Sequence, residues 1–290
     1  MNEAFVRSDG YFRSSSDTCD IFYSVWTPGS APCAVVQIVH GARENISDYE
    51  KIAEFLVSKG FVVCIHDQLG HGKSVSENGG EIGFFASDDG DGSLIRDIEN
   101  LRTIMRKKYR RLPYFLLGHR FGAFIAQAYA AAYPENTLDG LIISSPYKEN
   151  LGILKLVSKL SLTLKGARHR AHLLHKLETG EKANEKALSV KAYRDLLELA
   201  GYTKDHLASR ALPVFIVAGV SDRLGKGGKT AVKLYEKYFD AGVSDVSMKL
   251  YERSLLGASE KDEIFSDTAA WIKRVLDAKI ELIKQNTFHF

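Results

Sequence analysis

The residues with the clearest chemical meaning form the segment Gly118-His119-Arg120-Phe121-Gly122. The apolar run Tyr114–Leu117 before it predicts a buried strand, and the alanine-rich run Ala123–Ala132 after it predicts a helix. A sharp strand-to-helix turn with glycine on both sides of a central residue is typical of a nucleophile elbow, which presents a serine for attack. Here the central residue is Arg120, whose guanidinium stays protonated and has no free lone pair. The turn indicates a site for nucleophilic chemistry whose attacking atom is missing.

The strands and helices that could position this turn alternate along the chain. Ile21–Thr27 and Cys33–Val39 are rich in β-branched and aromatic residues and flank a Pro-Gly-Ser-Ala-Pro linker, which predicts two antiparallel opening strands. The capping-box pattern Ser47-Asp48-Tyr49-Glu50 predicts the start of a helix that ends at Gly60, before a buried strand at Phe61–His66. The other predicted elements are helix Ser93–Tyr109, strand Tyr114–Leu117, helix Phe121–Tyr133, strand Leu138–Ser144, strand Val214–Ala218, helix Gly228–Phe239, strand Val246–Tyr251 and helix Ile264–Ile283. This alternation predicts the α/β class, with a doubly wound, mostly parallel sheet.

The stretch Tyr147–Leu212 interrupts the alternation, because it is helical and lysine-rich and contains no convincing strand. We expect residues 147–212 to be a helical lid inserted above the sheet, and residues 1–146 and 213–290 to form the core. Its composition suits either a plain amphipathic helix packed on the domain, which we favour, or a lid with its apolar side over a pocket and its basic side in peripheral membrane contact. The interleaved residues are Lys155, Lys159, Lys165, Arg168, Arg170 and Lys176 among Leu154, Leu156, Val157, Leu160, Leu162, Leu164, Leu173 and Leu174.

Composition bounds the class of protein. The 290 residues are 45% hydrophobic, enough for one large folded domain with an insertion, and a net charge of +3 gives no general case for nucleic-acid binding. Only three cysteines occur, Cys19, Cys33 and Cys64, which favours a reducing compartment. The first residues lack a signal-peptide pattern and no stretch is long and uncharged enough to span a bilayer. We expect a cytoplasmic protein.

Four blocks, in this order along the chain, resemble the monoacylglycerol lipase and lysophospholipase family of α/β-hydrolases. They are His40-Gly41-Ala42-Arg43-Glu44, Asp67-Gln68-Leu69-Gly70-His71-Gly72-Lys73-Ser74, Gly118–Gly122 and Gly219-Val220-Ser221-Asp222. They are similar to the family's His-Gly oxyanion loop, its Asp-x-x-Gly-His-Gly-x-Ser turn, its elbow, and the turn that presents the triad acid. The similarity runs over almost the whole chain and implies an α/β-hydrolase fold.

The chemistry of that family needs a serine, a histidine that takes its proton, an acid that orients the histidine, and two backbone N–H groups facing the oxyanion. The resemblance assigns Asp222 to the acid and the N–H groups of Ala42 and Phe121 to the oxyanion hole. It assigns Arg120 to the nucleophile position and Leu256 to the histidine position. No histidine lies between positions 206 and 289, so a small register slip cannot restore the base. Without a histidine, Asp222 could also be a solvated turn residue that serves only structure.

These losses predict a pseudoenzyme of this family that binds a lipid-like small molecule or a protein partner. The alternative is an active carboxylic-ester hydrolase that cleaves a monoacylglycerol or lysophospholipid with rearranged residues. Ser144 or Ser145 could then be the nucleophile, although spacing identifies no histidine for either. A third hypothesis is that the two substitutions were introduced to trap a substrate, but such designs usually change one residue conservatively.

We expect neither a cofactor nor a metal. His40, His66, His71 and His119 lack the spacing of a ligand set and are better explained as loop-packing residues. Gly225–Thr230 imitates a phosphate-binding loop, but that motif needs glycine at the position of Arg223.

Overall fold

The computed structural model describes residues 5–86, 88–134, 138–146, 151–169, 171–172, 176, 188–222, 225–258 and 263–287. The strands are β1 (Val6–Arg13), β2 (Asp20–Thr27), β3 (Ala34–Val39), β4 (Phe61–His66), β5 (Tyr114–His119), β6 (Gly140–Ser144), β7 (Val214–Gly219) and β8 (Val246–Tyr251). The helices are η1 (Ile46–Tyr49), α1 (Glu50–Ser58), α2 (Gly72–Ser76), α3 (Gly90–Lys108), α4 (Phe121–Ala132), α5 (Leu151–Lys165), α7 (Val190–Asp205), α8 (Lys229–Asp240), η2 (Leu255–Gly257) and α9 (Glu263–Thr287).

The described strands form one sheet in the order β1-β2-β4-β3-β5-β6-β7-β8. From β4 to β8 all neighbours are parallel, whereas β1 and β2 are antiparallel. The predicted α/β fold is therefore confirmed. The two predicted opening strands, β2 and β3, run antiparallel to each other as expected. They are not neighbours, because the chain returns through α1 and places β4 between them, antiparallel to β2 and parallel to β3. β1 was not predicted, since its exposed, polar sequence lacks an apolar pattern.

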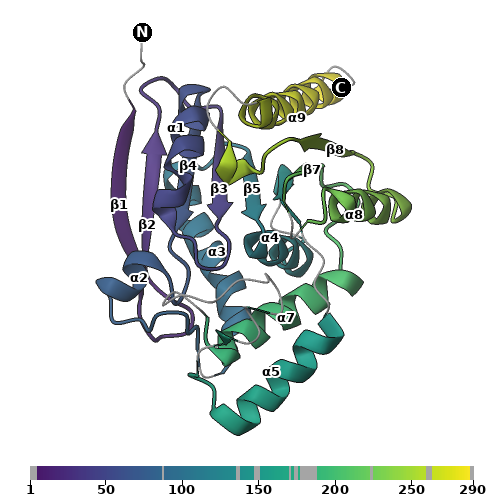
Figure 1. Ribbon diagram of the computed structural model, residues 1–290. Coiled ribbons are helices and arrows are strands. Elements are labelled where there is room, and N and C mark those ends of the chain that lie inside the picture. The colour runs from purple at the N-terminus through teal and green to yellow at the C-terminus, as the bar shows by residue number, and fades with distance from the viewer. Residues whose placement is uncertain are drawn as a thin grey trace.

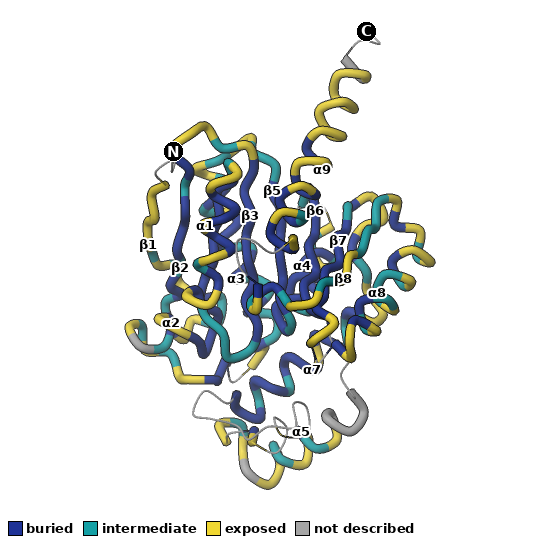
Figure 2. The backbone as a smooth tube through the Cα atoms, turned by 45° about the horizontal axis from the view of Figure 1, so that its top comes forward, coloured by how far each residue is buried: buried dark blue, intermediate teal, exposed yellow. Residues whose placement is uncertain are grey.

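Helices cover both faces of the sheet (Figure 1). Buried residues of α1 and α9 pack on one face, and those of α3, α4 and α8 pack on the other. The central strands β3, β4, β5 and β7 are buried at every residue, as expected for parallel strands covered on both sides (Figure 2). This double covering is why their sequences are continuous apolar runs.

The described residues between β6 and β7 include two helices, α5 and α7, which lie beyond the carboxyl ends of the parallel strands (Figure 1). α7 packs on α4 through buried residues that include Tyr193 and Leu197. The helical content predicted here is confirmed for these two helices. The side chains of 151–155 and 165, and residues 170 and 173–175, lie outside the described part of the chain, and with them several of the predicted lid positions.

The expected direction of the apolar side of α5 is wrong for three leucines. Leu156, Leu160 and Leu164 are 69%, 58% and 71% exposed, whereas Val157 and Leu162 pack against the core. The leucines at 156, 160 and 164 are four residues apart, so they share one helix face, and that face points away from the domain.

The start of α1 differs from the prediction. The capping box begins at Asn45 instead of the predicted Ser47, and it is formed by Asn45 and Asp48. Asn45 Oδ1 accepts from the Ser47 N–H at 2.9 Å, and Asp48 Oδ2 accepts from the Asn45 N–H at 2.9 Å. A 3-10 turn therefore precedes α1.

In the described residues, no helix has the length and apolar character needed to cross a bilayer.

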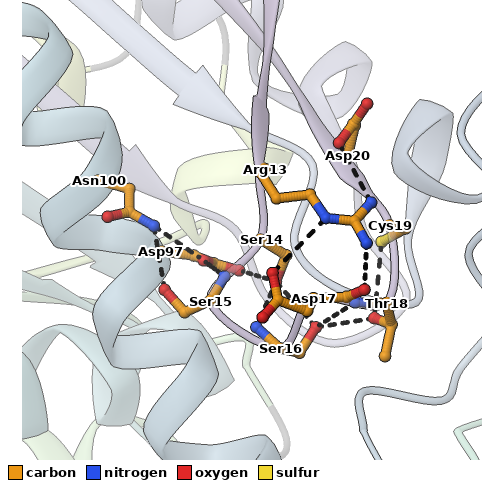
Figure 3. Close-up of polar contacts among 10 residues, drawn as sticks. All are labelled: Arg13, Ser14, Ser15, Ser16, Asp17, Thr18, Cys19, Asp20, Asp97 and Asn100. Carbon is orange, nitrogen blue, oxygen red and sulfur yellow. Dashed lines mark hydrogen bonds and ion pairs between the residues drawn. The ribbon is translucent and has the colours of Figure 1, made fainter.

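The β1–β2 hairpin is fixed to α3 by the buried Asp97 (Figure 3). Its carboxylate accepts hydrogen bonds from Ser14 Oγ and the Ser15 N–H, both at 2.7 Å. Burial raises the pKa of Asp97, and these hydrogen bonds oppose the rise. One carboxylate thus connects the exposed edge of the sheet to a core helix.

Candidate functional site

The central residue of the elbow, Arg120, has strained backbone angles. Its φ is 51° and its ψ is −115°, in the turn between β5 and α4, and its N–H donates to the Ser144 carbonyl at 2.9 Å. The flanking glycines are required by close packing. A Cβ on Gly118 would lie 2.3 Å from the Gly122 carbonyl oxygen, and one on Gly122 would lie 2.1 Å from the Val39 carbonyl oxygen. Such strain persists only where the surrounding structure enforces it, and it is common at active sites.

The loop after β3 lies at the same corner, because Gly122 packs against the carbonyls of Val39 and His40. Ala42 is partly buried in this loop, and Phe121 is the first residue of α4. The loop that carries Ala42 and the turn that carries Phe121 therefore lie at one corner of the fold. The role of these two residues as N–H donors stays a prediction.

Glu44 stabilises the loop after β3 through hydrogen bonds. Its Oε2 accepts hydrogen bonds from the Gly41 N–H and the Tyr49 hydroxyl, each at 2.6 Å. Burial raises the pKa of Glu44, and the Tyr49 hydrogen bond and the positive charge of Arg120 oppose the rise. The other carboxylate oxygen, Oε1, is 3.8 Å from Nη1 of Arg120.

Arg120 lies between two carboxylates. Its Nη2 is 3.8 Å from Asp222 Oδ2, in addition to the contact with Glu44. The arginine side chain is 34% exposed, whereas those of Glu44 and Asp222 are 12% and 4% exposed. The long arginine stem lets the cation contact both acids and still reach solvent.

Asp222 is buried, which argues against a solvated turn aspartate. It follows β7, and its N–H donates to the Gly219 carbonyl at 3.1 Å. The Val220 N–H donates to the Tyr251 carbonyl at 2.7 Å, so this turn is tied to the chain after β8. Farther along that segment, Leu256 lies in η2 and packs against the core layer of α1 and α9. The predicted histidine position is thus filled by an apolar contact.

The other histidines of the site are neutral packing residues. His40 Nδ1 donates to the Gly41 carbonyl at 2.8 Å, and its Nε2 accepts from the Gln68 N–H at 3.0 Å. His71 Nε2 accepts from the Arg43 N–H at 3.0 Å. Burial lowers the pKa of His40 to about 4 and that of His71 to about 3. Among the described residues, no cluster of three metal-ligating side chains occurs.

The structure contains a Ser–His contact that the spacing of these residues in the sequence did not predict. His119 Nδ1 lies 3.0 Å from Ser144 Oγ, and both residues are fully buried. Desolvation lowers the pKa of His119 well below its usual value, and His119 Nε2 is buried without a hydrogen-bond partner in the described structure. Among the described residues, no acid forms a hydrogen bond with this histidine, in contrast to a catalytic triad.

The family described as serine aminopeptidase, S33, a Hydrolase_4 family, matches residues 30–255. The chain belongs to this family. Monoglyceride lipase of Homo sapiens is 34% identical over 141 residues, which are 49% of this chain and 41% of that protein. Monoacylglycerol lipase of Mycolicibacterium smegmatis is 24% identical over 272 residues, which are 87% and 92% of the two chains. The monoglyceride lipase homolog of Monkeypox virus is 36% identical over 126 residues, 43% of each chain.

The chain thus spans less than half the length of the first relatives that it matches.

Solved structures agree on the fold. A carboxyl esterase from Bacillus coagulans superposes with a TM-score of 0.81 at 20% identity, over 93% of this chain and 99% of that chain. Monoglyceride lipase from Saccharomyces cerevisiae gives a TM-score of 0.67 at 19% identity, over 96% of each chain. This S33-family chain therefore has the α/β-hydrolase fold, and its sequence is similar to those of monoacylglycerol lipases.

Proposed function

We propose that this S33-family α/β-hydrolase is a pseudoenzyme that binds a lipid-like ligand without efficient serine-type hydrolysis. The observation that carries the proposal is the position of Arg120, at the centre of the elbow and 3.8 Å from Asp222. In a catalytic triad, a serine and a histidine fill that space. A guanidinium can neither attack a carbonyl carbon nor accept a proton at neutral pH. A protein partner is the alternative ligand.

We further propose that residues 147–212 act as a lid for this site. Tyr193 of α7 contacts Phe121 of the elbow, with ring centroids 6.1 Å apart, so movement of α7 would change access to Arg120. The exposed face of α5 formed by Leu156, Leu160 and Leu164 suits peripheral contact with a lipid surface, and the exposed Lys159 lies beside it.

A second candidate function rests on the Ser144–His119 contact, which could serve an active ester hydrolase. Two features oppose it. Both residues are fully buried, and the lowered pKa of His119 disfavours proton transfer from the serine.

Hydrolysis assays separate the two functions. The purified chain should hydrolyse p-nitrophenyl butyrate and a monoacylglycerol at the rate of buffer alone, and the Ser144→Ala variant should behave identically. Hydrolysis that Ser144→Ala abolishes would establish the active enzyme and overturn the pseudoenzyme.

A further inference from the structure

β1 is the last strand at the antiparallel edge of the sheet. Its eight residues all pair with β2 on one side. On the other side no described strand follows it in the sheet, and Figure 1 shows it as the outermost arrow. Alternate N–H and C=O groups along this side therefore have no ladder partner among the described strands, which makes β1 a template for one more strand.

Large apolar side chains are exposed towards both ends of this strand. Phe5, directly before β1, is 39% exposed, and Val6 and Tyr11 are 66% and 49% exposed. Charged side chains commonly protect an edge strand from random pairing, and β1 contains Arg7 and Asp9. Because these two charges are opposite in sign, they can also complement a second β1.

Both charged side chains keep hydrogen-bonding capacity for a partner. Asp9 Oδ1 accepts from Ser24 Oγ at 2.7 Å and from Arg7 Nε at 3.3 Å, whereas Asp9 Oδ2 accepts no hydrogen bond from the described residues. Arg7 donates once each from Nε, Nη1 and Nη2, which leaves two of its five N–H groups without a bond to the described residues. The Arg7 and Asp9 side chains are 35% and 42% exposed, so another charged chain can reach them.

An antiparallel copy of β1 complements this strand when the two-fold axis passes through Ser8. Arg7 of each copy then lies opposite Asp9 of the other, and Phe5 lies opposite Tyr11. Side chains alternate between the faces of a strand, so these four residues share one face. Opposite charges and aromatic pairs at facing positions both stabilise antiparallel strands.

Neighbouring registers are less favourable. An axis at Asp9 places the two Asp9 carboxylates opposite each other, and an axis at Gly10 places Arg7 opposite Arg13. An axis at Tyr11 matches Asp9 with Arg13 but leaves Arg7 beyond the end of the partner strand. Charge therefore favours the first register.

We propose that β1 pairs with β1 of a second copy of this chain, antiparallel and centred on Ser8, so that the two sheets become continuous. Backbone hydrogen bonds supply the association, and the two Arg7–Asp9 pairs select the register. One pair of strands is a small interface, so the dimer should be reversible. Three strands separate β1 from β5, which leads into the elbow, and the inference is independent of the proposed function.

Sedimentation velocity over a range of protein concentrations measures this equilibrium, and the wild-type chain should dimerise reversibly. Asp9→Lys places like charges opposite each other, and so does Arg7→Glu, so each variant should dimerise about tenfold more weakly. A mixture of the two variants should recover the dimer, because every substituted side chain then faces its opposite charge. Asp20→Lys is the control, since Asp20 is a half-exposed acid on β2, and it should dimerise like the wild type.

A cysteine at the axis gives a second measurement without a change of charge. Facing residues of antiparallel strands have Cα atoms about 4.5–5.5 Å apart, within the range of a disulfide. Oxidation should therefore link Ser8→Cys into dimers much more than Ser244→Cys, which changes an exposed serine outside β1. Cys33 is exposed in every variant and sets the background.

A wild-type chain that stays monomeric at every concentration would overturn a second copy as the occupant of this edge. Arg7→Glu that dimerises like the wild type would indicate a register without Arg7 and would contradict the inference, as would a mixture that stays monomeric. If a charge variant fails to fold, equal cross-linking of Ser8→Cys and Ser244→Cys would still overturn it.

Discussion

At the residue scale, the sequence was most informative about Arg120. The elbow motif predicted the turn in which Arg120 lies, and the structure places its side chain between two acidic neighbours. Its 34% exposure could not be predicted, because exposure depends on how loops from distant parts of the chain surround the site. The Ser144–His119 contact was missed for a related reason. These residues are partners in the β5–β6 register, and strand register cannot be derived from spacing.

Arg120, Glu44 and Asp222 form an ion-pair cluster in which the acids are more buried than the arginine. Substitutions of the arginine and of an acid should therefore change the free energy of unfolding by different amounts. Arg120→Met keeps most of the stem but leaves Glu44 and Asp222 buried without their shared cation. We expect a loss of about 2–3 kcal/mol in the free energy of unfolding, below the range for a fully buried pair. Asp222→Asn should cost about 1 kcal/mol, because Arg120 can still reach water.

Urea denaturation at pH 7 measures both effects, and Arg274→Met is the matched control. Arg274 pairs with Asp245 at 2.9 Å on an exposed surface, so the control should cost less than about 1 kcal/mol. If Asp222→Asn proved more costly than Arg120→Met, the cluster would not depend on the arginine in the way described.

At the element scale, most strands and helices were predicted within a few residues, because buried parallel strands and amphipathic helices have distinct apolar patterns. The errors fall where local sequence does not decide. The position of β4 between β2 and β3 is a choice of tertiary pairing, and the direction of the exposed leucines on α5 depends on which side of the helix meets α7.

The close contact between the elbow and β3 predicts a strong effect of a single methyl group. Gly122→Ala would place a Cβ 2.1 Å from a backbone oxygen that cannot move without shifting β3. We expect a loss of about 3 kcal/mol or failure to fold. Gly257→Ala is the control, since its nearest contact would be 3.7 Å away, and its melting temperature should match that of the wild type. Similar melting temperatures for both variants would mean that this junction is loosely packed.

The contact between α7 and α3 should depend on pH through Asp195. Its Oδ1 pairs with Lys191 at 2.6 Å, and its Oδ2 is buried against Gly90 without a hydrogen-bond partner in the described structure. Burial raises the pKa of Asp195 to about 6, and Lys191 opposes the rise. A raised acid pKa in the folded state favours the protonated form, so this contribution to stability is present below about pH 4 and is lost as the pH rises to about 6.

Asp195→Asn should therefore be more stable than the wild type at pH 7, by on the order of 2 kcal/mol, and the difference should shrink towards pH 4.5. Guanidinium denaturation at several pH values measures it. Of the nearby charges, Asp91 raises the pKa of Asp195 and Arg194 lowers it. Asp91→Asn should therefore lower the pH at which the contribution of Asp195 to stability is lost. A stability difference between Asp195→Asn and the wild type that is constant across this pH range would contradict the raised pKa of Asp195.

At the scale of the whole molecule, the proposed loss of hydrolytic chemistry is compatible with an intact fold, because catalysis and folding depend on different atoms. The elbow glycines and the β3 loop act through backbone packing, which any residue at position 120 that tolerates the strained turn leaves in place. In the assignment that the resemblance implies, the nucleophile and base would be side chains at positions 120 and 256, and these can change while the sheet and its helices remain. Sequence predicts the fold and the altered positions together, but it cannot supply the ligand, which depends on the shape of the assembled site.

We infer that the residues at positions 120 and 256 alone remove serine-type chemistry from an otherwise intact scaffold. Intact-mass measurement after treatment with a fluorophosphonate tests it most directly, because this probe adds covalently to an activated serine. The wild-type chain and the single variant Arg120→Ser should remain unmodified, and Arg120→Ser with Leu256→His should gain one adduct at position 120. An adduct on the folded wild-type chain, lost on denaturation before treatment, would contradict the account.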